Sequence, residues 1–397
     1  MRISTSMLHA QGLAAMQRQQ TQLSQTQNQL ASNLKWSSAA DDPAGYAAAQ
    51  GLDRQLAQLD QYQSNAAAAR HRLLIEEDAL AEGTDLLQRT RELAIQANSA
   101  GQSPESRAAI ALELQSLREQ LLAVANRDDG QGRYLFAGSS DAAPPFTWSG
   151  AAAQYGGDQQ VRTTQIGGSR SIAEGDAGDA VFQNLRTGNG RFAVAAEAAN
   201  TGSSQLTGAK LHDAALWDGG SYTLSFTAGG YEVRDASNSV IQSGSYSAGS
   251  ALRFRGVELS FSGTPADGDS YRIAPSQTQD ALALVDKLAR LVAQPQDSAA
   301  ARAQWQTALQ QGLSELETAQ THFSNVRSGI GLRLSAAEDA VNQIGAQQVH
   351  TQEALSDLRD LDYAEAASRL QQQLTALQAA QQTYMRVQGL SLFDYLR

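Results

Sequence analysis

The sequence predicts an α+β protein in which the amino- and carboxyl-terminal arms form a long antiparallel helical rod, with a central β-rich domain inserted between them. Residues 1 to about 128, and those after Pro275, are rich in Ala, Gln and Leu, which favour helices. The stretch from about 130 to 275 is rich in Gly, Ser, Thr and aromatic residues, with alternating apolar positions. A chain of 397 residues also exceeds what one hydrophobic core usually serves.

Three domains are expected. The first is a terminal helical domain, the second a helical rod domain, and the third a β-rich outer domain. Their predicted ranges are 1–42 with 363–397, 43–130 with 276–362, and 131–275.

Helices of the amino-terminal arm are predicted at 5–33, 43–99 and 104–127. Asp42 and Ser103 are each followed by a proline, and Asp or Ser before a helix that starts with Pro is a common start signal. In the carboxyl-terminal arm, breaks are expected at Gln294-Pro295 and at 328–331, where Ser-Gly-Ile-Gly suggests a helix hinge.

Strands of the central domain are predicted where apolar residues alternate. Gly229-Gly230 between the first two strands is expected to form a hairpin turn. The strands are marked by Tyr222, Leu224 and Phe226, by Tyr231 and Val233, by Leu252 and Phe254, by Val257, Leu259 and Phe261, and by Tyr271 and Ile273.

Composition excludes several classes of function. The formal net charge is -11, the isoelectric point is about 5.0, and no Lys/Arg cluster occurs, which disfavours nucleic-acid and anionic-membrane binding. With no Cys there can be no disulfide, thiolate metal site or Cys nucleophile. No run of about 18 apolar residues predicts a membrane span. The amino end lacks a basic start and a long apolar run, so export by an ordinary signal peptide is not expected.

Candidate chemical sites are weak, so we expect no enzyme, catalytic residue, cofactor or metal. Gly329-Ile330-Gly331 lacks the strand-turn-helix context of a dinucleotide loop. Asp267-Gly268-Asp269 is interpreted as a hairpin turn, and Glu76-Glu77-Asp78 as a solvated helix face. No pair of histidines has helical ligand spacing among His9, His71, His212, His322 and His350.

The two ends of the chain are unusually poor in charge. Arg18 is the only formal charge between Arg2 and Lys35, and Arg386 is the only one between Arg369 and Asp394. Solvated helix faces normally carry many charges. Both ends also show heptad spacing, which predicts coiled-coil seams. The alternative is that both helices are ordinary amphipathic helices packed within one monomer.

The amino-terminal seam includes Gln20 and Gln27 between its apolar residues, and the carboxyl-terminal seam includes Tyr363, Ala367 and Gln381. Polar seam positions lower stability but fix register and partner. The apolar tail after Gly389 is also expected to dock against another surface. The predicted assembly interface is Leu13, Met16, Leu23, Leu30, Leu34, Leu370, Leu374, Leu377, Tyr384, Leu390, Leu392, Phe393, Tyr395 and Leu396.

Six segments form candidate family motifs, namely 1–7 (MRISTSM), 41–44 (DDPA), 132–138 (GRYLFAG), 361–366 (LDYAEA), 381–384 (QQTY) and 387–393 (VQGLSLF). These segments resemble the flagellin-like axial proteins of the bacterial flagellum, and most closely the hook-filament junction proteins among them. One departure occurs before the first turn, where the family commonly has Gly and two basic residues and this chain has Asn33-Leu34-Lys35. Asn33 tolerates the left-handed conformation that such a turn requires.

The resemblance implies a structural subunit of the extracellular flagellum, exported by the flagellar type III system. Its implied partners are hook-associated protein 1 on the hook side, flagellin on the filament side, further copies of itself in a ring, and an export chaperone that binds the carboxyl-terminal helix. The alternatives are flagellin itself, or a secreted adhesin-like binding protein whose β-rich domain recognises a ligand and whose helices form a stalk.

Overall fold

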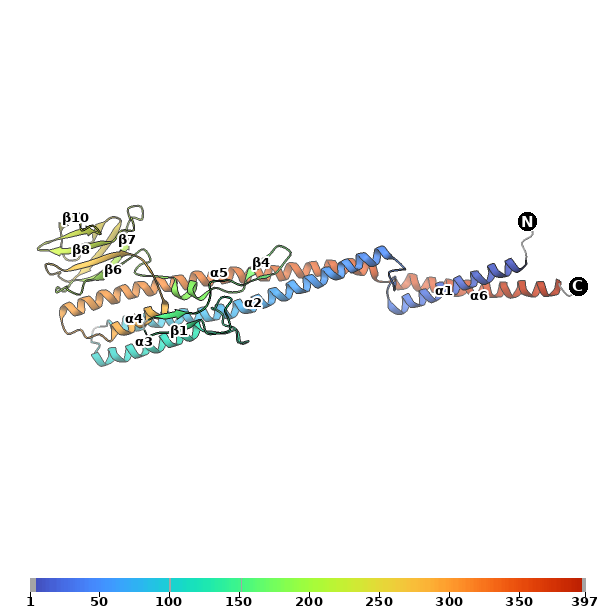
Figure 1. Ribbon diagram of the computed structural model, residues 1–397, viewed down its shortest axis with the longest axis horizontal. Coiled ribbons are helices and arrows are strands. Elements are labelled where there is room, and N and C mark those ends of the chain that lie inside the picture. The colour runs from blue at the N-terminus through green and yellow to red at the C-terminus, as the bar shows by residue number, and fades with distance from the viewer. Residues whose placement is uncertain (1–4, 100, 151, 395–397) are drawn as a thin grey trace. The chain divides into compact units, whose positions relative to one another are not determined.

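A computed structural model describes residues 5–99, 101–150 and 152–394 (Figure 1). The chain divides into two compact units. The first unit contains Met1–Ser64 and Ala340–Arg397, and the second unit contains Asn65–Asp339. The three-domain division stays a prediction. Six α-helices are present in the described chain, namely α1 (Thr5–Ser32), α2 (Pro43–Ala97), α3 (Pro104–Ala125), α4 (Ala281–Val292), α5 (Ala299–Arg359) and α6 (Tyr363–Asp394).

The predicted start signals of α2 and α3 are confirmed. The Asp42 carboxylate accepts a hydrogen bond from the Gly45 amide at 2.9 Å, and Pro43 is the first residue of α2. The Ser103 hydroxyl accepts one from the Ser106 amide at 3.1 Å, ahead of Pro104. These side chains satisfy amides that have no partner within the helix.

The break at Gln294-Pro295 is confirmed, since it separates α4 from α5. The predicted hinge at 328–331 is wrong, because α5 continues through it without interruption. Ile330 is fully buried, whereas a Cβ on Gly329 or Gly331 would meet nothing within 4 Å. Each exposed glycine costs a helix about 1 kcal/mol relative to alanine. Packing of the buried side chains offsets that cost.

The second unit contains a two-sheet β-domain, and every strand pair in it is antiparallel (Figure 1). A five-stranded sheet has the order β10-β9-β8-β13-β6, and a three-stranded sheet has the order β11-β12-β7. The strands are β6 (Phe192–Ala196), β7 (Gln205–Leu211), β8 (Tyr222–Thr227), β9 (Gly230–Asp235), β10 (Val240–Ser245), β11 (Leu252–Phe254), β12 (Val257–Ser262) and β13 (Ser270–Pro275).

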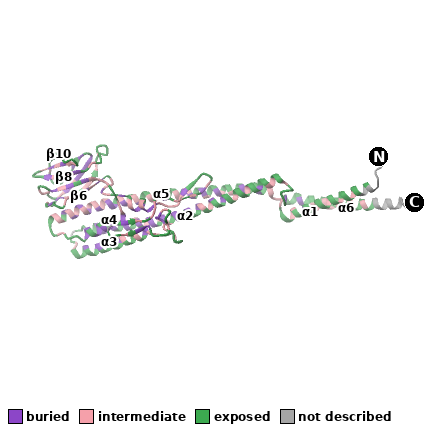
Figure 2. Cartoon of the chain, viewed as in Figure 1, coloured by how far each residue is buried: buried purple, intermediate pink, exposed green. Residues whose placement is uncertain are grey.

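The predicted strands are confirmed, and their alternating apolar residues form one buried core (Figure 2). Tyr222, Leu224 and Phe226 of β8 all lie in it. The hairpin turn lies one residue earlier than predicted, at Ala228-Gly229, because Gly230 already pairs with Thr227. Gly229 has φ 82°, a conformation that glycine adopts without strain.

Asp267-Gly268-Asp269 is not a hairpin turn, because β12 and β13 belong to different sheets. Asp269 is 2% exposed. Its carboxylate accepts hydrogen bonds from the amides of Thr201, Gly202 and Ala266. The side chain therefore stabilises the connection between the two sheets.

Short ladders connect the β-domain to the helices. The strand β5 (Leu185–Arg186) pairs with β14 (Thr278–Gln279), and the Thr187 amide donates to the Gln277 carbonyl at 2.9 Å. The chain therefore enters and leaves the β-domain side by side. The remaining elements are β1 (Phe146–Trp148), β2 (Ala153–Tyr155), β3 (Thr163–Gln165), β4 (Ser171–Ala173) and the π-helical η1 (Asp179–Gln183).

In the run Glu76-Glu77-Asp78 only Asp78 is exposed, so the interpretation as a solvated face is wrong for Glu76 and Glu77. Glu76 is 1% exposed, and Glu77 is half-buried in an ion pair with Arg327 of α5. The Glu76 carboxylate accepts a hydrogen bond from the Asp176 amide at 2.9 Å. The segment around residue 176 and α5 thus cover the part of α2 that the charge pattern had suggested was exposed.

None of the helices in the described ranges is long and apolar enough to cross a membrane.

Candidate assembly interface

The first and last helices, α1 and α6, pack along each other in the first unit (Figure 1). A Cβ on Gly12 would lie 3.3 Å from the Tyr384 ring, so this ring packs directly against the α1 backbone at Gly12. The Gln19 amide donates to the Gln373 carbonyl at 3.4 Å. The predicted contact between the two ends of the chain is therefore present within a single copy.

The inward face of α1 has heptad spacing, with steps of four and three residues. Its members are partly or fully buried, and Thr26 is only 3% exposed. Met16, Leu23 and Leu30 belong to both the predicted and the observed face. Among the α1 residues whose burial is described, those that follow this spacing are Gly12, Met16, Gln19, Leu23, Thr26 and Leu30.

The inward face of α6 has the same spacing and contains Ala366, which is fully buried. Leu370, Leu374, Leu377 and Tyr384 of the predicted interface are half-buried on or beside this face. Tyr363, Ala367 and Gln381 of the predicted seam are instead exposed. Among the α6 residues whose burial is described, those that follow this spacing are Ala366, Leu370, Gln373, Leu377, Ala380 and Tyr384.

Sequence reasoning missed the small and polar members of this seam, among them Gly12, Thr26 and Ala366. The sequence does contain a signal for them. Gly12, Gln19 and Thr26 are also seven residues apart, and together with Met16, Leu23 and Leu30 they form an equally regular heptad pattern. Small side chains at such positions let two helices approach closely.

Large apolar side chains lie outside the seam. Leu13 of α1 is 48% exposed, and Tyr363 and Met385 of α6 are 65% and 64% exposed. The exposed stripe of α1 contains Gln20 and Gln27, which follow Leu13 at intervals of seven residues. The terminal helix pair therefore exposes large apolar side chains outside its own seam.

The remaining predicted interface residues are placed as follows. Leu34 is half-buried beside the end of α5, where it forms an isolated bridge with Asp360. Leu390, Leu392 and Phe393 are part of α6. Tyr395 and Leu396 lie outside the described residues.

The corner between α1 and α2 is tied to the corner between α5 and α6. Asn33 has φ 57°, which confirms the left-handed residue expected at this turn. Its carbonyl accepts from the Leu361 amide at 3.1 Å, and the Lys35 amide donates to the Arg359 carbonyl at 2.8 Å. These two bonds fix the corner at which α1 ends and α6 begins.

Side chains stabilise the same corner. Trp36 is 8% exposed and packs edge-on against Tyr46, with 5.5 Å between ring centroids. The Asp41 carboxylate accepts hydrogen bonds from the amides of Ser37 and Ser38, both at 3.0 Å. These bonds favour the ionised form and lower the pKa of Asp41 below its usual value. Aromatic packing and hydrogen bonds therefore hold the first interhelix turn in a defined conformation.

Within the described ranges, no three His, Asp or Glu side chains lie together in a way that could hold a metal ion.

Comparison with known families gives matches to three parts of the chain. Residues 3–141 match the bacterial flagellin N-terminal helical region, and residues 313–396 match the bacterial flagellin C-terminal helical region. Residues 195–275 match the D2-like domain of flagellar hook-associated protein 1, which includes most of the two-sheet β-domain.

Individual relatives are flagellar proteins as well. Flagellar hook-associated protein 3 of Salmonella typhimurium is 31% identical over 185 residues, which covers 47% of this chain and 58% of that protein. The aligned region thus spans a little over half of the curated relative.

Solved structures extend the likeness over more of the fold. Xanthomonas campestris FlgL is 34% identical with a TM-score of 0.72, and the match covers 77% of this chain and 99% of that one. The flagellar junction protein FlgL from Legionella pneumophila is 29% identical with a TM-score of 0.68, over 73% and 99% of the two chains. Together with the paired terminal helices and the inserted β-domain, these matches show that the chain belongs to the FlgL family of flagellar hook-associated protein 3.

Proposed function

We propose that this chain is a structural, non-enzymatic subunit of the hook-filament junction of the bacterial flagellum, and that α1 and α6 are its assembly interface. The observation that carries the proposal is the exposure of large apolar side chains in the charge-poor parts of these two helices, where Leu13 is 48% and Met385 is 64% exposed. Exposed apolar residues in a charge-poor stripe indicate a surface that another protein covers.

The seam within one chain is weak, which also supports assembly. Gln19, Thr26 and Gln373 occupy positions where a stable coiled coil would have apolar residues. The Gln373 side-chain oxygen is buried without a hydrogen-bond partner, and such a group lowers stability. Packing against neighbouring subunits would add apolar burial, at about 1 kcal/mol for the exposed half of a leucine.

The partners follow from this role and from the names of the relatives. We propose hook-associated protein 1 on the hook side, flagellin on the filament side, and a ring of identical subunits between them. An export chaperone would bind α6 before assembly, and the flagellar type III system would export the chain to the extracellular flagellum. These partners are expectations for the assembled organelle.

The test uses one substitution on each of two exposed leucines. Leu13→Glu places a charge on the proposed interface, while Leu112→Glu makes the same change on α3 at a leucine that is 66% exposed. Neither leucine is buried, so both variants should unfold at the temperature of the unmodified protein. Leu13→Glu should fail to restore motility to a strain that lacks the gene, and Leu112→Glu should restore it.

The readouts are thermal unfolding by circular dichroism, swimming motility, and electron microscopy of hook ends for attached filaments. Filaments on hooks that carry Leu13→Glu would contradict the proposed interface. A loss of motility with Leu112→Glu, but not with Leu13→Glu, would place the essential contact on α3 instead.

A further inference from the structure

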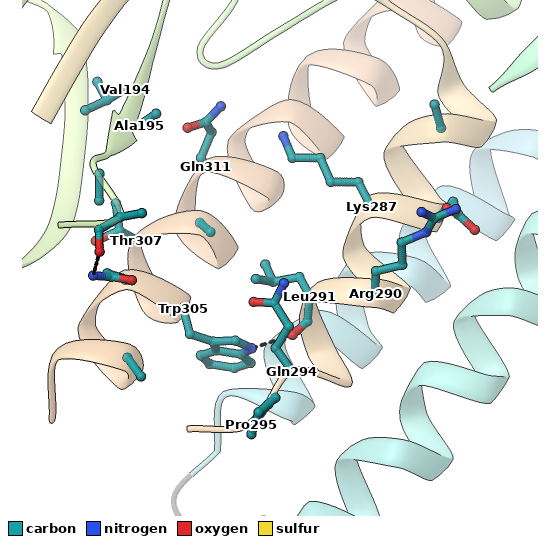
Figure 3. A pocket seen from close by; sticks show the side chains of 17 residues that line it. Val194, Ala195, Lys287, Arg290, Leu291, Gln294, Pro295, Trp305, Thr307 and Gln311 are labelled. Carbon is teal, nitrogen blue, oxygen red and sulfur yellow. Dashed lines mark hydrogen bonds and ion pairs between the residues drawn. The ribbon is translucent and has the colours of Figure 1, made fainter. Parts of the chain in front are cut away.

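A groove of about 690 Å³ lies between the β-domain and the helices of the second unit (Figure 3). Its walls are strand β6 on one side and helices α4 and α5 on the other. Figure 3 shows Val194 and Ala195 across the groove from Lys287 and Arg290, with Trp305 on α5. Nothing in the proposed junction role accounts for this groove.

The wall formed by β6 is an unpaired sheet edge. Strand β6 pairs with β13 on one side only. The Glu197 amide donates to the Ser270 carbonyl, and the Ser276 amide donates to the Arg191 carbonyl. In an antiparallel ladder this places the bonding groups of the odd-numbered residues of β6 toward β13.

The amides and carbonyls of Val194 and Ala196 therefore point away from β13, toward the groove. No other strand of the described chain pairs with this edge. An open edge of this kind is a template for an added strand.

The rest of the groove is fixed in place. The Trp305 indole is 3% exposed and donates to the Leu291 carbonyl at 2.7 Å. The β-domain is held to α5 by Gln304, whose amide donates to the Asn200 carbonyl at 2.9 Å, and by Thr307, whose hydroxyl accepts from the Leu206 amide at 3.0 Å. A preformed groove lowers the entropic cost of binding.

The groove presents positive charge. The side chains of Lys287 and Arg290 are 47% and 57% exposed, whereas their partners Glu315 and Asp286 are 0% and 8% exposed. Asp286 is also paired with Arg118 at 3.0 Å. Lys287 and Arg290 are therefore the charged groups of the groove that solvent reaches, while the carboxylates that pair with them are buried.

We propose that this groove binds an extended peptide strand from a partner protein, which pairs with the free edge of β6 and places a carboxylate side chain beside Lys287 and Arg290. Backbone hydrogen bonds to Val194 and Ala196 fix the strand, and the exposed cationic groups of Lys287 and Arg290 select an acidic sequence. The proposal does not depend on the junction role.

The probe is the capped peptide acetyl-Ser-Val-Glu-Val-Glu-Val-Ser-amide, titrated into the full-length protein by isothermal calorimetry. Ala196→Pro removes the outward amide of Ala196, a change that an edge strand tolerates, and should weaken binding about tenfold. Ser243→Pro is the matched control, because Ser243 lies on the opposite edge of the same sheet, in β10. It should leave binding unchanged.

A second pair of variants tests the charge. Arg290→Gln should weaken binding several-fold, while Arg302→Gln, an exposed residue of α5 outside the groove, should not. The same peptide with Lys in place of Glu should bind at least about tenfold more weakly. The proposal is overturned by absence of binding of the acidic peptide at millimolar concentration, by equal binding of both peptides, or by unchanged affinity in Ala196→Pro and Arg290→Gln.

Discussion

Replacing the buried carboxylate of Glu76 should remove a large part of the pH dependence of stability. Burial, and to a smaller extent the neighbouring carboxylate of Asp176, raise the pKa of Glu76 from 4.5 to about 8, against the opposing effect of Arg333. The carboxylate accepts one hydrogen bond, from the Asp176 amide, and its second oxygen is buried without a partner. The protonated form is therefore the one that the folded protein favours.

The sign of the effect follows from proton counting. Between pH 4.5 and about 8 the folded state holds a proton on Glu76 that the unfolded chain has released. The free energy of unfolding therefore falls as pH rises through this window and levels off above it. A rise in the pKa of Glu76 from 4.5 to about 8 corresponds to roughly 5 kcal/mol of unfolding free energy over the whole window. About 3 kcal/mol of this stability is lost by pH 7.

Glu76→Gln keeps the shape of the side chain and removes its titration. We expect the variant to unfold with a free energy close to that of the unmodified protein near pH 4.5 and several kcal/mol higher at pH 9. Glu77→Gln is the control, because Glu77 is adjacent and pairs with Arg327 at a half-buried site. The loss of the Glu77 carboxylate should lower the free energy of unfolding by about 1 kcal/mol or less and leave its dependence on pH unchanged.

The assay is urea unfolding followed by circular dichroism, from pH 5 to pH 9, for all three proteins. The informative quantity is the difference in unfolding free energy between Glu76→Gln and the unmodified protein at each pH. A difference that stays constant across the series would refute the reasoning, because it would mean that Glu76 does not titrate in this window.

Two further predictions concern the turn and the β-domain. Asn33→Gly should leave thermal stability nearly unchanged, while Asn33→Val should lower the unfolding free energy by about 1–2 kcal/mol, because a β-branched residue is strained at φ 57°. A chain that lacks residues 188–276, with Thr187 joined to Gln277 by a short Gly-Ser linker, should keep its helical circular dichroism and restore motility to a null strain, because these two residues are already hydrogen-bonded. An exported, folded but non-motile product would show that the β-domain is essential, as the adhesin alternative requires.

Local signals were sufficient to predict many features of this fold. The Asp42-Pro43 and Ser103-Pro104 pairs predicted where α2 and α3 begin, because capping is decided within a few residues. Asn33 predicted the left-handed turn for the same reason. Alternating apolar residues predicted the strands, because the side-chain period of a strand is two.

Features that depend on distant contacts could not be predicted in this way. Residues 328–331 look like a helix break by composition, but Ile330 is buried and the helix continues. Glu76 looks solvated because its neighbours in sequence are charged, yet the segment around Asp176 covers it. The groove beside β6 is made of three elements that come together only in the folded chain.

The terminal helices show most clearly what a pattern can and cannot decide. Two heptad registers, one residue apart, share Met16, Leu23 and Leu30 on α1, so spacing alone could not choose between them. The folded chain uses the register that contains Gly12, which lets the Tyr384 ring approach the backbone. The residues found only in the other register, Leu13, Gln20 and Gln27, remain exposed in the single chain. A helix with two overlapping heptad stripes can pack against two neighbours at once, one within its own chain and one in another subunit, as assembly of a junction would require.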